Sequence, residues 1–462
     1  MEEQQVSFVD QLNAWVGAVG GVVWGPYMLI PLLLGVGVIM MVGLKFMPLA
    51  KLGYAFGVMW KGRKHDPEHE GELSPFNALM TSMAATVGTG NIVGVATAIY
   101  LGGPGAVFWM WITAFFGMAT KYCESLLAVK FREVTPNGSF VGGPMYYIKN
   151  GLGANWKWMA TLFAIFGAVA SFGIGNMTQS NAIATNLTNL TGVSGPVVAV
   201  VLLVLAGIVL IGGVKRIGNV AGTLVPIMAL IYIIGGIFSL ILHADKIPEA
   251  FGLIFGSAFS GTAAMGGFAG STLAMAMRFG IARGLFSNEA GLGSAPIAHA
   301  TAITKSPVRQ GMLGMLDPFL DTIVVCTITA LVIMTSGHWN DPEATNAGLL
   351  TSISFATALP GSWGSYLVTC GLVLFAYSTI LGWCVYGERC IIYLFGDKAA
   401  LPFRVIFTLA VPIGAVSELS LVWNLADLFN GLMAIPNLIA LLLLCPIVFS
   451  MTKEYFKDGN PK

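Results

Sequence analysis

The chain has 462 residues, of which 56% are hydrophobic and only 10% are charged, and its mean hydropathy is +0.79. Soluble domains carry about 25% charged residues, so a soluble fold could not cover this much apolar surface. The net charge of +1 excludes the strongly basic surface of a nucleic-acid-binding protein. The sequence therefore predicts an all-α polytopic membrane protein with no nucleic-acid partner.

Windows of about 20 apolar residues, the length that crosses a bilayer, predict eleven transmembrane helices. They lie at 18–45, 75–100, 104–130, 158–187, 195–213, 219–243, 282–303, 311–336, 360–388, 402–420 and 423–450. With the N-terminus outside, the cytoplasmic side receives every lysine and arginine, Lys121 included, except Lys246, Arg278 and Arg283. This distribution follows the positive-inside rule. We therefore expect a multi-pass protein of the cell membrane with its C-terminus in the cytoplasm.

Two connections between the predicted spans are long. Residues 131–157, which contain GGPMYYIKNGLG, are expected to form a cytoplasmic hairpin with a short interfacial helix. Residues 244–281 alternate apolar runs with glycine and serine on the predicted outside. They favour an amphipathic cap over a re-entrant segment or part of an extra span.

The second and seventh spans share an unusual pattern. The second contains Thr86-Val-Gly-Thr-Gly-Asn91 and the seventh contains Glu289-Ala-Gly-Leu-Gly-Ser294, each near the middle of its span. Because the two spans run in opposite directions, the pattern predicts a 5+5 inverted-repeat core, spans 2–6 and 7–11, preceded by an added first helix. The corresponding division is 1–73 (first helix and cytoplasmic loop), 74–246 (first repeat), 247–281 (cap), 282–452 (second repeat) and 453–462 (cytoplasmic tail).

Glycine-interrupted segments at matching positions of inverted halves indicate the binding site of a transporter. Irregular backbone is tolerated at membrane depth only where protein or a water-filled cavity surrounds it. The exposed N-terminus of a half-helix attracts a carboxylate, and freed carbonyls suit a hard cation. We therefore predict two broken helices that bind an amino acid and a cation. The alternative for a pair such as Gly90 and Gly94 is close helix packing alone.

The run GGPGAVFWMWITAFFG, at Gly102–Gly117, resembles the signature of the alanine or glycine:cation symporter family. The stretches Gly175–Ala184 and Arg283–Pro296 resemble the same family, and the similarity extends over nearly the whole chain. This resemblance implies an inverted-repeat amino-acid transporter fold and sodium- or proton-driven uptake of alanine or glycine.

The second span also resembles the first helix of the neurotransmitter:sodium symporters, in Gly88, Gly90 and Asn91. That resemblance implies that the amides of Thr89 and Gly90 hold the carboxylate of the substrate. For a second sodium ion Thr86 and Asn91 are available, but the sequence departs from the neurotransmitter pattern there, because a glutamate occupies the facing repeat.

The same resemblance implies one sodium site. Its ligands would be the carbonyls of Ala84 and Val87 and the hydroxyls of Ser378 and Thr379 in the ninth span. Oxygen ligands agree with the preference of hard cations. The alternative is that both hydroxyls bond back to their own helix.

Other polar residues within the predicted spans are expected to face the interior of the bundle. Gln179 is the preferred side chain for the ammonium or carboxylate of the substrate, with interhelical hydrogen bonding as the alternative. Glu289 could ligate a cation, bind the ammonium, carry a proton or pair with Arg283. Asp317 and Asp321 are expected to form structural salt bridges with basic residues.

The candidates fall into three sets. Those for the substrate are Thr86, Gly88, Thr89, Gly90, Phe172, Asn176, Gln179, Asn181, Ser287, Asn288 and Trp383, of which Phe172 and Trp383 would limit the size of the side chain or would simply pack. Those for sodium are Ala84, Val87, Ser378 and Thr379. Asn91 and Glu289 are candidates for an ion or a proton.

The predicted function is sodium-coupled symport of alanine, and possibly of glycine, into the cell by alternating access. Sodium is the coupling ion, no organic cofactor, transition metal or catalytic residue is expected, and a single chain should suffice for transport. A proton-coupled symporter of another small solute is the first alternative. A channel, which would more usually show a filter repeated around a pore, and a non-transporting sensor are the others.

Overall fold

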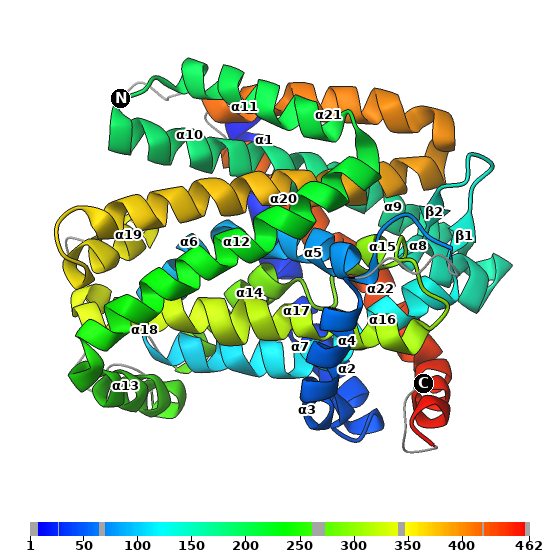
Figure 1. Cartoon of the computed structure of the whole chain (residues 1–462), viewed down its shortest axis with the longest axis horizontal. Coiled ribbons are helices and arrows are strands. Elements are labelled where there is room, and N and C mark those ends of the chain that lie inside the picture. The colour runs from blue at the N-terminus through cyan, green and yellow to red at the C-terminus, as the bar shows by residue number, and fades with distance from the viewer. Residues whose placement is uncertain are drawn as a thin grey trace.

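The computed structural model describes residues 8–25, 27–63, 70–260, 273–340, 347–417 and 420–457. Long helices dominate, and most run roughly along the long axis of the molecule, with α13 and α19 toward one end and the β1–β2 hairpin at the other (Figure 1). β1 (Glu133–Val134) and β2 (Phe140–Val141) form an antiparallel pair in which Glu133 lies opposite Val141. Residues 131–157 thus contain a hairpin and the short helix α8, as predicted, while their cytoplasmic and interfacial placement stays a prediction.

In the first half of the chain the helices are α1 (Phe8–Val23), α2 (Leu29–Gly43), α3 (Met47–Ala50), α4 (Leu52–Lys61), α5 (Pro75–Thr86), α6 (Val93–Gly102), α7 (Gly105–Lys130), α8 (Pro144–Tyr147), α9 (Lys157–Phe172), α10 (Thr178–Thr191), α11 (Gly195–Leu210) and α12 (Gly213–Leu242). In the second half they are α13 (Ile247–Ser260), α14 (Leu273–Asn288), α15 (Ala295–His299), α16 (Pro307–Gly314), α17 (Leu316–Pro318), α18 (Thr327–Ser336), α19 (Ala347–Ala358), α20 (Trp363–Phe395), α21 (Ala400–Val416) and α22 (Ser420–Tyr455).

Six helical stretches in the described part are long and apolar enough to cross a membrane. They are Ala154–Thr191, Gly213–Leu242, Pro307–Ser336, Trp363–Phe395, Asp397–Val416 and Leu421–Tyr455. Helices α11 and α12 turn large apolar side chains outward, among them Val204, Ile208, Ile234 and Ile241. Outward apolar surface of this kind fits a lipid environment. The chain is therefore a mostly helical membrane protein, while the count of eleven spans stays a prediction.

The first predicted span, 18–45, is wrong as a single helix. Helix α1 ends at Val23 and α2 begins at Leu29. The sequence between them contains Gly25 followed by proline, and the residue before a proline is disfavoured in a helix. Helix α1 packs against α22, whereas α2 packs against both α7 and α22.

The seventh span begins nine positions earlier than its predicted start at residue 282, because α14 begins at Leu273. The glycine and serine residues among the apolar runs of 244–281 led to its prediction as a connection, and Arg278 lies in the part that is helical. The guanidinium groups of Arg278 and Arg283 each lie near the aromatic ring of a residue in the same helix, Phe279 and Phe286 respectively, which lets a charged residue occupy an otherwise apolar helix.

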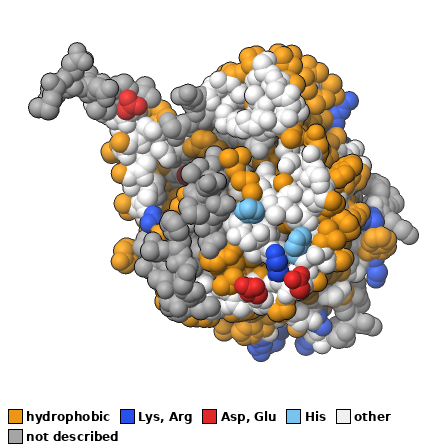
Figure 2. Space-filling view, turned by 90° about the vertical axis from the view of Figure 1, so that its left-hand side faces the viewer, with side chains coloured by type: hydrophobic (Ala, Val, Ile, Leu, Met, Phe, Trp, Pro, Cys, Tyr) orange, Lys and Arg blue, Asp and Glu red, His pale blue; other side chains and the backbone are white. Residues whose placement is uncertain are grey.

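The predicted cap is partly described. Helix α13 has 14 residues, fewer than the ~20 needed to span a bilayer. It lies against α7, where Phe255 and Phe259 contact Phe108 and Phe255 also contacts Trp111. Residues 261–272 lie outside the described residues. The end of the molecule that carries α13 and α19 shows few charged side chains among hydrophobic and uncharged ones (Figure 2).

Two interrupted helices lie next to each other at the centre of the fold. The first consists of α5 and α6, and the second of α14 and α15. Helix α6 packs against α14, and α5 packs against α15. The first half of each interrupted helix is thus beside the second half of the other, so the two run antiparallel, as the opposed repeats predict.

Candidate functional site

The first interruption follows directly from the glycine pattern. Helix α5 is capped by Ser74, whose hydroxyl accepts a hydrogen bond from the amide of Asn77 at 3.1 Å. It ends at Thr86, and Val87 turns away from helical geometry with ψ of 92°. A 3-10 turn at Thr89–Asn91 leads into α6. The Asn91 side chain closes this first break by accepting a hydrogen bond from the amide of Gly88 at 2.8 Å.

The second interruption is built in the same way. Helix α14 ends at Asn288, whose side-chain oxygen accepts a hydrogen bond from the amide of Ala290 at 3.0 Å. Gly291 and Gly293 have φ of +90° and +83°, in the left-handed region that glycine adopts without a steric cost. Glu289 has φ of +53°, which is uncommon for a residue with a Cβ and is found at binding sites. The second break therefore needs its glycines for backbone conformation.

The glycines of the first break also allow close approach. A Cβ atom at Gly90 would lie 3.2 Å from Cα of Ser287, and a Cβ atom at Gly88 would lie 2.6 Å from Oγ1 of Thr379. The packing alternative considered from the sequence is thus correct in part. The same glycines both unwind the first break and bring it against α14 and α20.

A small cavity lies between the two breaks, and its volume of about 10 Å³ is room for about one water molecule. The residues that line it are Ala85, Thr86, Gly88, Thr89, Gly90, Ile174, Gln179, Phe286, Glu289, Thr379 and Trp383. Most of the predicted substrate residues near the breaks therefore meet in one place. Because alanine is larger than a water molecule, side chains must move before it can enter.

Gln179 and Glu289 supply acceptors at this cavity. The Nε2 of Gln179 donates to the carbonyl of Ile174 at 2.9 Å, while its buried Oε1 finds no hydrogen-bond partner among the described residues. The Glu289 carboxylate accepts from Nε1 of Trp383 at 3.1 Å and from Oγ of Ser294 at 2.5 Å. The predicted option of a pair with Arg283 is therefore wrong, because an indole and a hydroxyl occupy the Glu289 oxygens.

Trp383 reaches the cavity because a glycine lies opposite it. A Cβ atom at Gly175 would be 2.2 Å from Cβ of Trp383. Gly175 belongs to a π-helical turn, Gly173–Met177, which joins α9 to α10. Such turns are frequent at functional sites, and here the turn places a glycine where α20 comes closest.

Three predicted substrate residues, Phe172, Asn176 and Asn181, are not among the cavity-lining residues. All three contact α21 instead. The Phe172 ring packs against Phe403 and Phe407, and Nδ2 of Asn176 donates to the carbonyl of Phe407 at 2.6 Å. Nδ2 of Asn181 donates to the carbonyls of Gly414 and Ser417 at the end of α21. Asn176 thus binds a carbonyl in the middle of α21, whereas Asn181 satisfies carbonyls at its C-terminal end, where helices leave such groups unpaired.

Asp321 connects the two breaks. Its Oδ1 accepts from Nδ2 of Asn91 at 2.6 Å, and its Oδ2 accepts from Oγ of Ser287 at 2.8 Å and from Oγ1 of Thr322 at 2.8 Å. Asn288 donates to Thr322 in the same π-helical segment, Phe319–Cys326. The predicted salt bridge for Asp321 is therefore wrong, because its hydrogen-bond donors are neutral. Asn91, Ser287 and Asn288 lie around this carboxylate rather than at the cavity wall.

Asp317 forms the salt bridge that the sequence predicts, with Nζ of Lys121 at 2.9 Å. It also accepts hydrogen bonds from Ser82 and Thr86 in α5, both at 2.7 Å. Lys121 is fully buried, so it is not a solvent-exposed charge, and its position on the cytoplasmic side stays a prediction. The ion pair accounts for its burial, because a buried ammonium requires a buried partner.

A further buried carboxylate, Glu124, contacts the second break, and it was not predicted from the sequence. Oε1 of Glu124, in α7, accepts from the amide of Gly293 at 3.1 Å and from Nδ2 of Asn437 at 2.6 Å. Nδ2 of Asn437, in α22, also donates to the carbonyl of Gly291 at 2.8 Å. The available signal was the presence of Lys121 and Glu124 inside an apolar helix, where charged residues are costly and usually functional.

The predicted sodium residues lie where α5 meets α20. The hydroxyls of Ser378 and Thr379 donate to the carbonyl of Phe375, at 2.8 and 2.9 Å. Both hydroxyls therefore bond back to their own helix, which is the alternative that the sequence left open. Ala84 is in the last turn of α5, and Val87 follows its end. A Cβ atom at Gly382 would lie 2.7 Å from the amide nitrogen of Ala85, so α20 lies directly against this end of α5.

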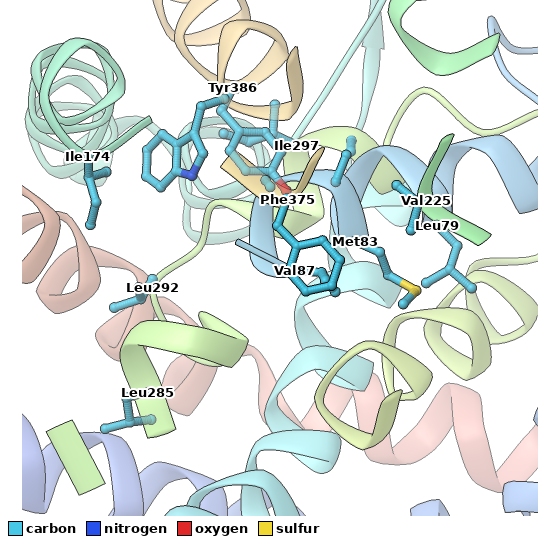
Figure 3. Packing of buried hydrophobic residues seen from close by; sticks show 14 of the residues in the cluster. Leu79, Met83, Val87, Ile174, Val225, Leu285, Leu292, Ile297, Phe375 and Tyr386 are labelled. Carbon is cyan, nitrogen blue, oxygen red and sulfur yellow. The ribbon is translucent and has the colours of Figure 1, made fainter. Parts of the chain in front are cut away.

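Hydrophobic side chains enclose both breaks. Figure 3 shows Met83 and Val87 from the first interrupted helix and Leu285 and Leu292 from the second, in one core with Phe375 and Tyr386. All of these side chains are buried. The polar groups of the breaks are thus surrounded by apolar packing, where an unpaired charge is most costly.

Long apolar helices and two adjacent broken helices with a polar cavity between them define a multi-pass membrane transporter. Residues 9–461 match the model of the sodium:alanine symporter family. The chain belongs to this family of sodium-coupled amino-acid transporters.

Two named relatives are similar over almost their whole length. The sodium/alanine symporter AgcS of Methanococcus maripaludis is 50% identical, with 97% of each chain covered. The probable sodium/glutamine symporter GlnT of Bacillus subtilis is 39% identical, with 96% of this chain and 90% of that one covered. Among solved structures, MhsT in complex with L-phenylalanine superposes with a TM-score of 0.57 over 83% of this chain and 98% of that chain, at 14% identity. That likeness shows a common fold.

Proposed function

We propose that this chain carries alanine, and also glycine, into the cell together with sodium. Its eleven spans form one added helix and a 5+5 inverted core in the cell membrane, with the N-terminus outside, the C-terminus in the cytoplasm and one chain sufficient for transport. The observation that carries the proposal is the cavity between the two antiparallel broken helices, where backbone amides, a carboxylate and an amide oxygen converge.

The cavity offers complementary groups to a zwitterion. The amides of Thr89 and Gly90 precede α6, and the start of a helix favours a carboxylate. The ammonium then faces Glu289 and the unpartnered Oε1 of Gln179. Ile174, Phe286 and Trp383 leave room for a small side chain only.

Sodium binds beside the first break in this proposal. The carbonyls of Ala84 and Val87 and the hydroxyl oxygens of Ser378 and Thr379 are its ligands. Both hydroxyls donate their protons to the carbonyl of Phe375, so their oxygen lone pairs remain free to face a cation. Hard cations prefer such oxygen ligands.

The outer side of the cavity is closed by Phe286. This residue also lines a second cavity of about 220 Å³, bounded by α1, α14 and α22, with Arg283 and Asp427 in its wall. Movement of the Phe286 ring would join the two cavities, so we assign Phe286 as the outer gate.

The inner side is closed by charged groups and backbone pairing. Oε1 of Glu72 accepts from Arg389 in α20 at 2.6 Å, and Glu388 binds Arg404. Leu73, just before α5, forms a β-bridge with Ala302, just after α15. The Leu73–Ala302 bridge joins the two interrupted helices, so it must separate when the inner side opens. The pair of Glu72 and Arg389 joins the start of α5 to α20, and the pair of Glu388 and Arg404 joins α20 to α21.

The test is uptake of labelled alanine into proteoliposomes with an inward sodium gradient, compared with an equal potassium gradient. We expect accumulation above equilibrium with sodium only. Gln179→Met should lower alanine affinity about tenfold or more, since it removes an acceptor for a charged group. Thr161→Val, on the same helical stretch and distant from the cavity-lining residues, is the matched control. Uptake that ignores the sodium gradient would refute the proposal.

A further inference from the structure

Glu124 is a buried carboxyl group whose two oxygens differ in their hydrogen bonding. It is fully buried, its Oε1 accepts from Gly293 and Asn437, and its Oε2 finds no hydrogen-bond partner among the described residues. Nothing in the proposed transport of alanine and sodium uses this group. The unpartnered oxygen therefore requires its own explanation.

The titratable groups around Glu124 compensate its charge only in part, since the nearby Lys121 ammonium is already paired with another carboxylate. On its own helix, the Nζ of Lys121 is bound to Asp317 at 2.9 Å, and Cys123 is uncharged at neutral pH. Tyr147 in α8 faces it but binds the side-chain oxygen of Asn437. Tyr386 in α20 faces it as well, and is neutral at the same pH.

Other buried carboxylates near the breaks are better compensated. Asp317 has the Lys121 ammonium, Asp321 accepts three hydrogen bonds, and Glu289 accepts two, one on each oxygen. An ionised Glu124 would instead hold an unpaired oxygen in an apolar interior, at a cost of several kcal/mol. A neutral carboxyl avoids most of that cost.

The charge of Glu124 is more readily cancelled by a proton than by a metal cation. A sodium ion needs several oxygen ligands, but the side-chain oxygen of Asn437 and the carbonyl of Gly291 already accept hydrogen bonds. A proton needs only Oε2. We propose that Glu124 binds a proton in the closed form of the transporter and loses it when the inner side opens, so that alanine binding and proton binding are linked.

The geometry explains how opening would release the proton. Glu124 contacts the second break through Gly293 and contacts α22 through Asn437. If either element moves away from α7, water reaches Oε2 and the ionised carboxylate becomes hydrated. The proposal rests on the proposed function, because the closed form is the one that holds alanine.

The experiment is equilibrium binding of labelled alanine to the purified protein in saturating sodium, from about pH 5 to about pH 8, where Lys, Tyr and Cys keep their protons. If the closed form holds one more proton than the open form, alanine affinity falls as pH rises, by up to about tenfold per pH unit. Glu124→Gln should abolish this slope and keep the high affinity of the wild type at low pH. Glu133→Gln, in the β1 strand, is the matched control and should retain the slope.

A flat wild-type profile, or a slope that persists in Glu124→Gln, would overturn the proposal. Should that variant fold poorly, an indicator dye in weak buffer measures proton uptake by the wild type directly. We expect uptake approaching one proton per chain when alanine is added, and no uptake would overturn the proposal. Sodium-dependent alanine binding at low pH, measured in the same samples, shows separately whether the proposed function holds.

Discussion

Substitution of Gly88 by alanine tests the contact between the first break and α20. The added Cβ would lie 2.6 Å from Oγ1 of Thr379, well inside the ~3.5 Å at which non-bonded heavy atoms attract each other. The φ of Gly88 is −142°, so alanine meets no backbone strain there, and the effect comes from this contact alone.

The Gly88→Ala variant can relieve the contact between the added Cβ and Thr379 in two ways. Thr379 can rotate and lose its hydrogen bond to Phe375, which costs about 1 kcal/mol, or α20 can move away from the break. Overpacking of this kind costs about 1–3 kcal/mol. Either change displaces the Thr379 hydroxyl, so the sodium concentration for half-maximal alanine uptake should rise about tenfold.

Gly94→Ala is the matched control for Gly88→Ala. Gly94 is in α6, and among the described residues no atom beyond its chain neighbours and its own helix backbone lies within 4 Å of a Cβ placed there. Alanine in a helix is favoured over glycine by about 0.5–1 kcal/mol, so this variant should be slightly more heat-stable and should transport normally. The measurements are sodium titration of alanine uptake and the thermal unfolding midpoint. An unchanged sodium requirement in a folded Gly88→Ala protein would refute the proposed role of Thr379.

Three further variants test the ion pair, the inner closure and the outer gate. Lys121→Met should lower stability by about 3–5 kcal/mol, since it leaves Asp317 charged and buried without its partner, and Lys121→Met combined with Asp317→Asn should recover part of the loss in thermal unfolding. Glu72→Gln should weaken the contact with Arg389 and raise the labelling rate of a cysteine placed on the inner side, whereas an unchanged rate would argue against a role in closure. Phe286→Ala should speed exchange of bound alanine with the outside, measured as the dissociation rate of labelled alanine, and an unaltered rate would remove Phe286 from the gate.

The interruptions of the two helices could be predicted because their cause is local. Gly88 and Gly90 in one span and Gly291 and Gly293 in the other lie within a few residues of the polar groups they serve. Positive φ at Gly291 and Gly293 and close approach at Gly88 and Gly90 are both properties that only glycine supplies. A pattern of six residues was therefore enough to locate each break.

The neighbours of Gln179 were harder to predict, because a π-helical turn precedes it. In a regular α-helix, residues three or four positions apart share a face, so Asn176 and Gln179 should point the same way. The wider turn at Gly173–Met177 adds a residue and rotates the side chains of α9 relative to those of α10. Gln179 consequently faces the cavity while Asn176 faces α21.

The contacts of Lys121, Glu124 and Asn437 could not be predicted for a different reason. Lys121 pairs with a residue 196 positions away and Asn437 with one 313 positions away. No local spacing encodes such pairs. The sequence could show only that charged residues lie inside an apolar helix, and the fold was needed to identify their partners.

The carboxylates of the segment Pro307–Ser336 make the two breaks mechanically dependent on each other. Asp317 binds Thr86, and Asp321 binds Asn91 and Ser287, so one helical stretch holds residues on both sides of the first break and the last turn of α14. A shift of either break away from this stretch would leave a buried carboxylate oxygen unpaired, at about 1–3 kcal/mol or more for a charged group. Once one of these contacts is broken, movement of the residues held by the other contacts therefore becomes more favourable. In the proposed function alanine binds between the breaks, and this dependence then provides a physical route by which its binding moves both broken helices together.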